Sequence, residues 1–189
     1  MSAEDNWTPA HAPRERVDLG DVVVRRWTTD DAEALHIAVT ESIDHLRPWM
    51  PWISREPLTV ADRRSLIETW SREWDERRDF TMGIFGPDGA VGGTGLHLRS
   101  GPRSVDIGYW LRADNVGRGI MTRVVVALVE SAFMLEDVDL VVIQHDEGNT
   151  PSGRVAERAG FICDHRYTRE PQAPGETGTM LRWIRTRER

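Results

Sequence analysis

The chain has 189 residues, of which 39% are hydrophobic and 29% are charged. These values are ordinary for one soluble globular domain that is long enough to bury a core. The net charge of −7 argues against a nucleic-acid-binding protein, because such proteins normally carry a basic face. No run of about 18 apolar residues occurs, so the sequence predicts no membrane-spanning helix and no membrane partner.

The N-terminal segment and the cysteine content predict a cytoplasmic protein. Residues 1–16 contain chain breakers and little apolar periodicity, so we expect a flexible tail there and a single domain over residues 17–189. The tail has no apolar stretch of the kind that a secretory signal carries. Cys163 is the only cysteine, which excludes an internal disulfide and fits a reducing compartment.

In chain order, the first half of the sequence alternates between strand and helix patterns. The predicted elements are a strand over 22–27, helices over about 30–46 and 60–77, and strands over 80–86 and 90–99 joined by a Pro-Asp-Gly turn. Asp30 and Glu33 have the spacing of a capping box at the start of the first helix. Pro48 and Pro51 end that helix, because proline lacks the amide that a helix needs.

The second half continues the same mixture of strands and helices. The predicted elements are a strand over 104–111, a long helix from near 118, a strand over 139–145, a short helix over 151–159, and strands over 161–168 and 179–184. Along the strand 104–111, Asp106 lies on the face opposite the apolar residues. This order predicts a mixed α/β (α+β) sheet of six or seven strands with about four helices on both of its faces.

A glycine-containing loop between a strand and the long helix carries the clearest chemical signal. Residues 115–122 read Asn-Val-Gly-Arg-Gly-Ile-Met-Thr. A helix N-terminus offers unpaired amides and partial positive charge, and the glycines allow a phosphate to approach the backbone. An ATP-type loop is excluded because the chain has no lysine, and a dinucleotide fingerprint would need glycine where Thr122 stands. A plain helix-capping loop is the alternative that the segment alone leaves open.

The segments around this loop resemble a known enzyme family. IGYWL, then GRGIMT, then a strand, then N-x-x-S-x-x-V-A-E-R-A-G-F closely resemble the GNAT acyltransferases over roughly residues 20–185. Together with LRPWMPW (residues 46–52), they are similar to the ribosomal-protein N-acetyltransferase (RimJ/RimL-like) branch. The resemblance implies the GNAT acyl-CoA acyltransferase fold and acetyl-CoA as the acetyl donor.

The resemblance also implies which residues bind the donor. The pantetheine arm would pair with the strand end formed by Tyr109, Trp110, Leu111 and Arg112. The pyrophosphate would rest on the loop and helix start formed by Gly117, Arg118, Gly119, Ile120, Met121 and Thr122, with Arg118 adding a charged contact. Asn149 would contact the pantetheine amides, and Ser152 would lie near the sulfur. Val116 departs from the family pattern and removes one polar contact.

For catalysis, the same resemblance points to Asp106 and Ser152. Asp106 would act as the base; the alternative is a surface charge. Ser152 would orient the sulfur or pass a proton to it, or serve only as a hydroxyl at the start of the short helix. Many GNATs use a tyrosine at the position of Ala156, so that route is absent here. His145 is expected to be packed, and the histidines show no metal-ligand spacing, so no metal is predicted.

The acceptor is less narrowly defined. In GNATs the region of Trp49 and Trp52 covers the acceptor pocket, so both would bind the substrate together with Asp106; the alternative is a hydrophobic plug between helices. The acceptor would be a protein or peptide N-terminal α-amine, or else a small-molecule amine. A non-catalytic CoA-binding module is the third hypothesis. The sequence does not define the oligomeric state, and a homodimer is compatible with it.

Overall fold

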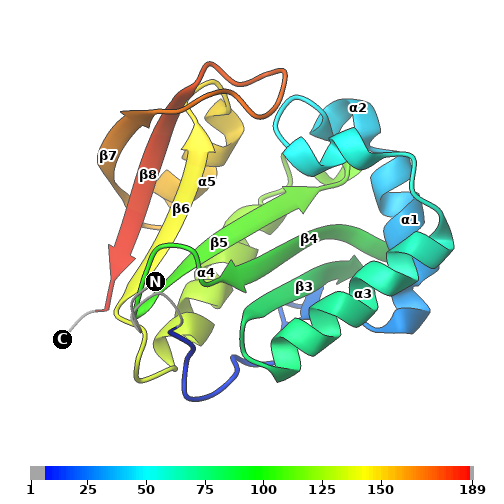
Figure 1. The fold of residues 1–189 in the computed structure, drawn as a ribbon, viewed down its shortest axis with the longest axis horizontal. Helices are drawn as coiled ribbons and strands as arrows, with labels where there is room; N and C mark the ends of the chain where they lie inside the picture. Colours follow the sequence, from blue (N-terminus) through cyan, green and yellow to red (C-terminus); the bar gives the residue numbers. More distant parts are fainter. Residues whose placement is uncertain (1–6, 188–189) are drawn as a thin grey trace.

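The computed structural model describes residues 7–187, and residues 1–6 and 188–189 lie outside the described part. The strands form one eight-stranded sheet in the order β1-β2-β3-β4-β5-β6-β8-β7 (Figure 1). They are β1 (Arg16–Asp18), β2 (Val23–Arg26), β3 (Asp79–Gly86), β4 (Gly89–His97), β5 (Ser104–Leu111), β6 (Leu140–Asp146), β7 (Ile162–Thr168) and β8 (Thr179–Thr186). The helices are α1 (Ala32–Thr40), α2 (Ile43–Leu46), α3 (Val60–Asp75), α4 (Ile120–Phe133) and α5 (Thr150–Arg158), with short 3-10 helices η2 (Thr29–Asp31), η3 (Pro51–Arg55) and η4 (Ala113–Asn115).

The predicted mixed α/β sheet is confirmed, but its strand count of six or seven is too low. The additional strand is β1, which has three residues and exists because it pairs with β2. Three residues are too few to give a periodic signal. Part of the predicted flexible tail lies outside the described residues. Within the described part, the Ala10 amide donates to Asp137 at 2.8 Å, and Arg77 donates to the Ala10 carbonyl.

The helices form two layers around the sheet (Figure 1). Helices α4 and α5 pack against β5 and β6, while α1 and α3 pack against β4 and β3. Each layer has its own apolar core, the larger one centred on α4 and the smaller one on α1 and α3. Cys163 is exposed on β7, at one edge of the sheet. No helix in residues 7–187 is long and apolar enough to cross a membrane.

The start of the first helical segment differs from the prediction. The capping box is formed by Thr28 and Asp31 instead of Asp30 and Glu33, with the Thr28 amide and hydroxyl both donating to Asp31. The segment also divides into α1 and α2 at Ser42. The Ser42 hydroxyl accepts the amide of Ala113 at 3.2 Å, which ties this break to the loop after β5. Periodicity alone does not reveal such a tertiary contact.

Strands β5 and β6 form a fork in the middle of the sheet. They are parallel neighbours only from Ser104 to Asp106, which pair with Leu140 to Val142. Beyond this point β5 stays paired with β4 as far as Leu111, and β6 stays paired with β8 as far as Asp146. The two strands therefore separate while each keeps one hydrogen-bonded neighbour.

The end of β6 is fixed by the buried carboxylate of Asp146. One carboxylate oxygen accepts from the Gly148 amide at 2.9 Å and from the Thr177 hydroxyl at 3.0 Å; the other accepts from the Gly178 amide at 2.9 Å. Burial raises the pKa of Asp146, but these hydrogen bonds outweigh it and hold the pKa below its usual value. This residue joins the turn before α5 to the loop before β8.

We predict that Asp146→Asn destabilises the protein at pH 7 by about 2–3 kcal/mol, the range for hydrogen bonds to a charged group. Because the folded pKa is depressed, the carboxylate contributes stability above its unfolded pKa of about 3.9 and loses it as the pH falls through the folded value. Urea unfolding should therefore show a gap between wild type and variant that narrows below about pH 4.

The matched control is Asp44→Asn, which removes the same charge from an exposed residue with no hydrogen bond recorded in the described part. We expect it to change the free energy of unfolding by less than about 0.5 kcal/mol at either pH. Equal losses in the two variants would show that Asp146 acts only through net charge.

Candidate active site

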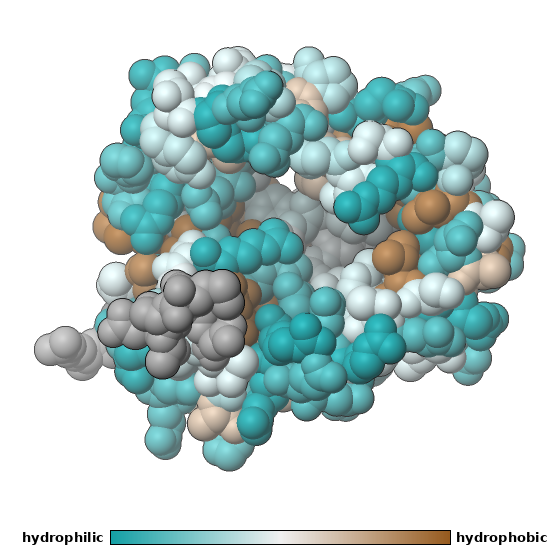
Figure 2. All heavy atoms as spheres, in the orientation of Figure 1, coloured by the Kyte–Doolittle hydropathy of each residue, from teal (hydrophilic) through white to brown (hydrophobic). Residues whose placement is uncertain are grey.

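A large cavity lies at the β5–β6 fork. It has a volume of about 660 Å³, and Gly108, Tyr109 and Trp110 line it from β5. Residues from Ile143 to Asp146 line it from β6. The face drawn in Figure 2 is hollowed near its centre, between the β6–β8 side and the α1–α3 side. A cavity of this size is typical of small-molecule and cofactor sites.

The loop between β5 and α4 has the form of an anion cradle. Gly117 and Gly119 have φ values of 75° and 72°, a left-handed conformation that favours glycine. The amides of residues 117–122 donate no hydrogen bond to another protein group in the described structure. A Cβ added at either glycine would meet no atom within 4 Å, so the loop is open to a ligand. Unpaired amides at the start of a 14-residue helix fit a pyrophosphate.

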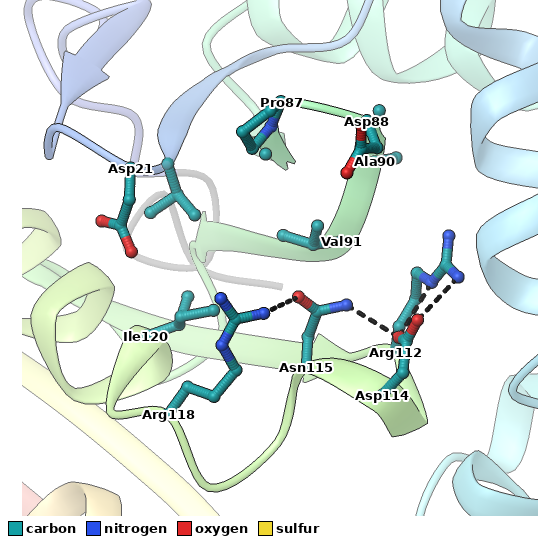
Figure 3. Close-up of a pocket in the computed structure, with 13 residues that line it drawn as sticks. Asp21, Pro87, Asp88, Ala90, Val91, Arg112, Asp114, Asn115, Arg118 and Ile120 are labelled. Atoms are coloured by element: carbon teal, nitrogen blue, oxygen red, sulfur yellow. Dashed lines mark hydrogen bonds and ion pairs between the residues drawn. The ribbon is translucent and has the colours of Figure 1, made fainter.

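Two arginines near this loop are engaged with protein groups. Beside the loop lies a smaller cavity of about 380 Å³, into which Arg118 extends (Figure 3). Its guanidinium donates to the side-chain oxygen of Asn115 at 3.3 Å. Arg112 donates to Asp114 and to Glu41, each at 2.9 Å. These hydrogen bonds all go to protein groups, and the contacts of Arg112 and Arg118 with the cofactor stay predictions.

A tyrosine reaches the serine that the sequence singled out. The Tyr109 hydroxyl lies 2.7 Å from Ser152 Oγ and 3.2 Å from the Ser152 carbonyl oxygen. Burial raises the pKa of Tyr109 to about 12, although the hydrogen bond with Ser152 acts in the opposite direction. The phenol is therefore protonated at neutral pH. No tyrosine was predicted beside the sulfur from the sequence, because the tyrosine that many GNATs use corresponds to Ala156 on α5. Ala156 is fully buried.

Asn149 is placed to serve both the helix and a ligand. Its side-chain oxygen accepts the amide of Ser152 at 3.3 Å, which caps α5. Its side-chain amide nitrogen donates to no protein group in the described part. Asn149 also lines the cavity, so this nitrogen is available to a ligand carbonyl.

The structure places Asp106 inside the protein but off the lining of the large cavity. The residue is 7% exposed, so the alternative of a surface charge is wrong. One carboxylate oxygen accepts from Ser100 Oγ at 2.8 Å and from Gln144 Nε2 at 3.0 Å. The other oxygen is buried without a partner in the described structure. The role of Asp106 as the base stays a prediction.

Tryptophans cover the cavity on the α1–α3 side. Trp49 and Trp52, the two that the sequence assigned to the acceptor pocket, both line it. Trp52 packs edge-on against Trp110 with ring centroids 5.9 Å apart. The complete tryptophan lining is Trp27, Trp49, Trp52, Trp70 and Trp110. Trp70 is half-buried and packs against the smaller apolar core while it lines the cavity.

Two histidines line the cavity, and they differ in their hydrogen bonds. His145 Nδ1 lies 2.7 Å from the Asp146 carbonyl, and Trp183 Nε1–H donates to His145 Nε2 at 2.9 Å. Burial lowers the pKa of His145, which is 7% exposed. His97 Nδ1 instead lies 2.8 Å from both carboxylate oxygens of Asp79. No role was predicted for His97 or Asp79 from the sequence.

A buried ion pair also lines the cavity, and it was not predicted from the sequence. Arg63 donates to Glu56 at 2.6 Å, and their side chains are 3% and 4% exposed. The sequence separates them by seven residues with no pairing signal. In the described part, no group of three or more His, Cys, Asp or Glu side chains is arranged to hold a metal ion.

Known proteins share both the sequence pattern and the fold of this chain. The model of the "Acetyltransferase (GNAT) domain" family matches residues 21–162. YdaF of Bacillus subtilis (strain 168), named as a ribosomal N-acetyltransferase, is 27% identical over 142 residues, which cover 75% of this chain and 78% of YdaF. YjcK of the same organism, named as an N-acetyltransferase, is 28% identical over 147 residues, covering 74% of this chain and 80% of YjcK.

Solved structures show the same architecture. RimL, a ribosomal L7/L12 α-N-protein acetyltransferase in complex with coenzyme A, has a TM-score of 0.83 at 20% identity, covering 91% of this chain and 98% of RimL. RimJ of Mycobacterium smegmatis, in complex with a CoA disulfide, has a TM-score of 0.77 at 25% identity, covering 87% of this chain and 81% of RimJ.

We predict that Tyr109 keeps its proton throughout the neutral range. In a ring-carbon NMR titration, the signal that disappears in Tyr109→Phe should stay unshifted up to about pH 10, where an ordinary phenol is half ionised. A midpoint at that ordinary value would show that the phenol is solvated and does not donate within the buried pair with Ser152.

Proposed function

The chain belongs to the acetyltransferase (GNAT) domain family, and we propose from this that it acetylates the N-terminal α-amine of a protein or peptide. It is an acetyl-CoA-dependent N-acetyltransferase. One observation carries the proposal: the β5–β6 fork joins an open amide cradle to a cavity roofed by tryptophans. The donor would enter along the cradle side and the acceptor from the tryptophan side.

The residues around the fork fit acetyl-CoA, which supplies an activated acetyl group when bound. The amides of residues 117–122 would hold the pyrophosphate, since no protein group uses them. From Ile107 onward β5 is unpaired on the side facing β6, so its backbone would pair with the pantetheine amides. Asn149 would add a side-chain hydrogen bond to the same arm. The sequence prediction likewise assigned the pantetheine arm to the strand end that includes Trp110 and Leu111.

The chemistry of the acceptor favours an α-amine. At pH 7 an α-amine with a pKa near 8 is about one-tenth neutral, while a lysine-type amine is neutral about once in a few thousand molecules. Only the neutral amine attacks a thioester. A site with modest base assistance therefore suits an N-terminus better than a lysine side chain.

Ser152 and Tyr109 would serve the leaving sulfur. A coenzyme thiolate has a pKa near that of cysteine, about 8.5, so a nearby proton donor helps its departure. Ser152 Oγ is 2.7 Å from a phenol that holds its proton at neutral pH. A serine relaying the proton of Tyr109 would replace the helix tyrosine that other GNATs use.

A small-molecule amine is the second candidate acceptor. The volume of about 660 Å³ falls within the range of small-ligand pockets, and five tryptophans would suit a planar or apolar amine. The protein acceptor is preferred because YdaF is named as a ribosomal N-acetyltransferase and RimL as a ribosomal L7/L12 α-N-protein acetyltransferase. A cytoplasmic location follows from that preference, and a homodimer stays an untested prediction.

The deciding experiment measures thiol release from acetyl-CoA with a panel of N-terminal peptides and small primary amines. Each peptide has a matched control in which the α-amine is blocked and an internal lysine is kept. We expect release with free N-termini and none with the blocked peptides. Release with small amines alone would establish the second candidate, and CoA binding without release on any acceptor would establish a non-catalytic module.

We predict that Gly119→Glu weakens coenzyme A binding at least about tenfold, because the carboxylate would lie against the phosphates. Calorimetric titration measures this. The control is Gly101→Glu, which adds the same side chain at another glycine with positive φ (93° against 72°) and open space, in the loop at the far end of β5. Unchanged affinity in Gly119→Glu would place the nucleotide elsewhere, and equal losses in both would indicate backbone strain.

A further inference from the structure

We propose that His97, oriented by Asp79, is the general base that removes a proton from the acceptor amine. The inference rests on the proposed acetyl transfer and identifies its base. His97 is the last residue of β4, and Asp79 lies opposite it as the first residue of β3. Both side chains are largely buried, at 12% and 22% exposure.

The imidazole lies across the sheet toward the fork. A Cβ added at Gly95 would be 2.8 Å from His97 Cε1, and one added at Gly108 would be 3.0 Å from His97 Nε2. The ring therefore occupies the space that side chains would fill at these two positions. Gly108 lies two residues beyond the last β5–β6 pair, which places His97 Nε2 at the root of the fork.

The hydrogen bonds of His97 leave one nitrogen for the substrate. Nδ1 is 2.8 Å from both oxygens of Asp79, which is itself held by Thr81 Oγ1 at 3.1 Å. A carboxylate accepts, so Nδ1 carries the hydrogen and Nε2 has the lone pair. No protein group in the described part donates to Nε2, and the residue lines the large cavity. In His145, by contrast, both nitrogens are engaged.

Charged groups surround this histidine from every neighbouring element. Asp106 on β5 is its cross-strand partner, and Arg99 follows it after β4. From the α3 side the cavity is lined by the Arg63–Glu56 pair, and from β6 by His145 and Asp146. Arg63 and Glu56 form an ion pair with each other. The carboxylate of Asp79 contacts His97 and Asp106 lies opposite it on β5, and carboxylates at these positions would attract an ammonium group.

The proton balance of the step is complete with the two substrates. His97 Nε2 accepts one proton from the R–NH3+ acceptor and later releases it to solvent. The amine lone pair then forms the N–C bond to the acetyl carbon as the C–S bond breaks. The Ser152–Tyr109 pair passes a proton to the departing thiolate, and the second proton on nitrogen replaces it through solvent, which gives the amide and the free thiol.

Asp106 is the competing base, and its contacts favour His97. One Asp106 oxygen is taken by Ser100 and Gln144, and the residue does not line the large cavity. A carboxylate is also, as a class of side chain, a weaker base than an imidazole. Asp106 would then contribute its charge to the field around His97 without touching the amine.

The test compares the pH dependence of kcat/KM in wild type, His97→Gln and Asp106→Asn, using any primary amine that wild type acetylates. We expect His97→Gln to lose about 100-fold at pH 6.5, the lower range for a general base. Its kcat/KM should rise tenfold per pH unit up to the pKa of the amine that is used, whereas wild type reaches its plateau at a lower pH. Acetyl-CoA affinity should not change.

Nitrogen NMR provides a second readout that needs no turnover. The neutral imidazole of His97 should be the Nδ1–H tautomer, and Asp79→Asn should weaken that preference while lowering kcat/KM about tenfold. His165→Gln, which removes an exposed histidine on β7, is the control and should behave as wild type. If His97→Gln does not fold, Asp79→Asn replaces it in the test and should show the same kind of change in the pH dependence of kcat/KM.

Three outcomes overturn the proposal. One is a His97→Gln profile that coincides with wild type, and another is a pH-dependent loss that appears only in Asp106→Asn. The third is an Nε2–H tautomer of His97. Absence of turnover by wild type on every amine would instead contradict the proposed acetyl transfer, so the two failures are distinguishable.

Discussion

The separation of β5 from β6 after three residue pairs determines where the rest of the site lies. A strand interior cannot usually expose its backbone groups without loss, because unpaired amides and carbonyls are costly when buried. Here each strand keeps its other neighbour, β4 or β8, so the sheet stays intact while a slot opens inside it. Asp146 fixes the far side of this slot by joining β6 to the loop before β8.

The alternation of side chains along β5 then distributes the chemistry between two faces. Tyr109 points toward α5 and meets Ser152, where the leaving group would need a proton. Gly108, the residue before it, leaves room on the opposite face for His97, where the amine would lose one. The proposed acid is thus attached to β5 at Tyr109, and the proposed base lies over the adjacent residue, Gly108, on the other face. The arrangement needs no metal ligand set, and it places both groups beside the same slot.

The parts that could be predicted from the sequence are those encoded locally. The apolar alternation of β5 and the glycines before α4 gave correct elements, because period and turn chemistry are properties of short segments. The Asp79–His97 pair could not be predicted. The hairpin turn alone would align Asp79 with Leu96, but an irregularity after Ile84 shifts the register by one residue and brings His97 opposite. A one-residue shift exchanges the two faces of a strand, and nothing in the local sequence signals it.

The position of the single cysteine limits the order of events. Cys163 is exposed on β7 and does not line the cavity, so no thiol is present there to receive the acetyl group for a time. This agrees with the proposed transfer, in which the acetyl group passes directly from donor to acceptor while both are bound. Steady-state kinetics of such a ternary complex give double-reciprocal lines that intersect, in contrast to the parallel lines of a ping-pong enzyme.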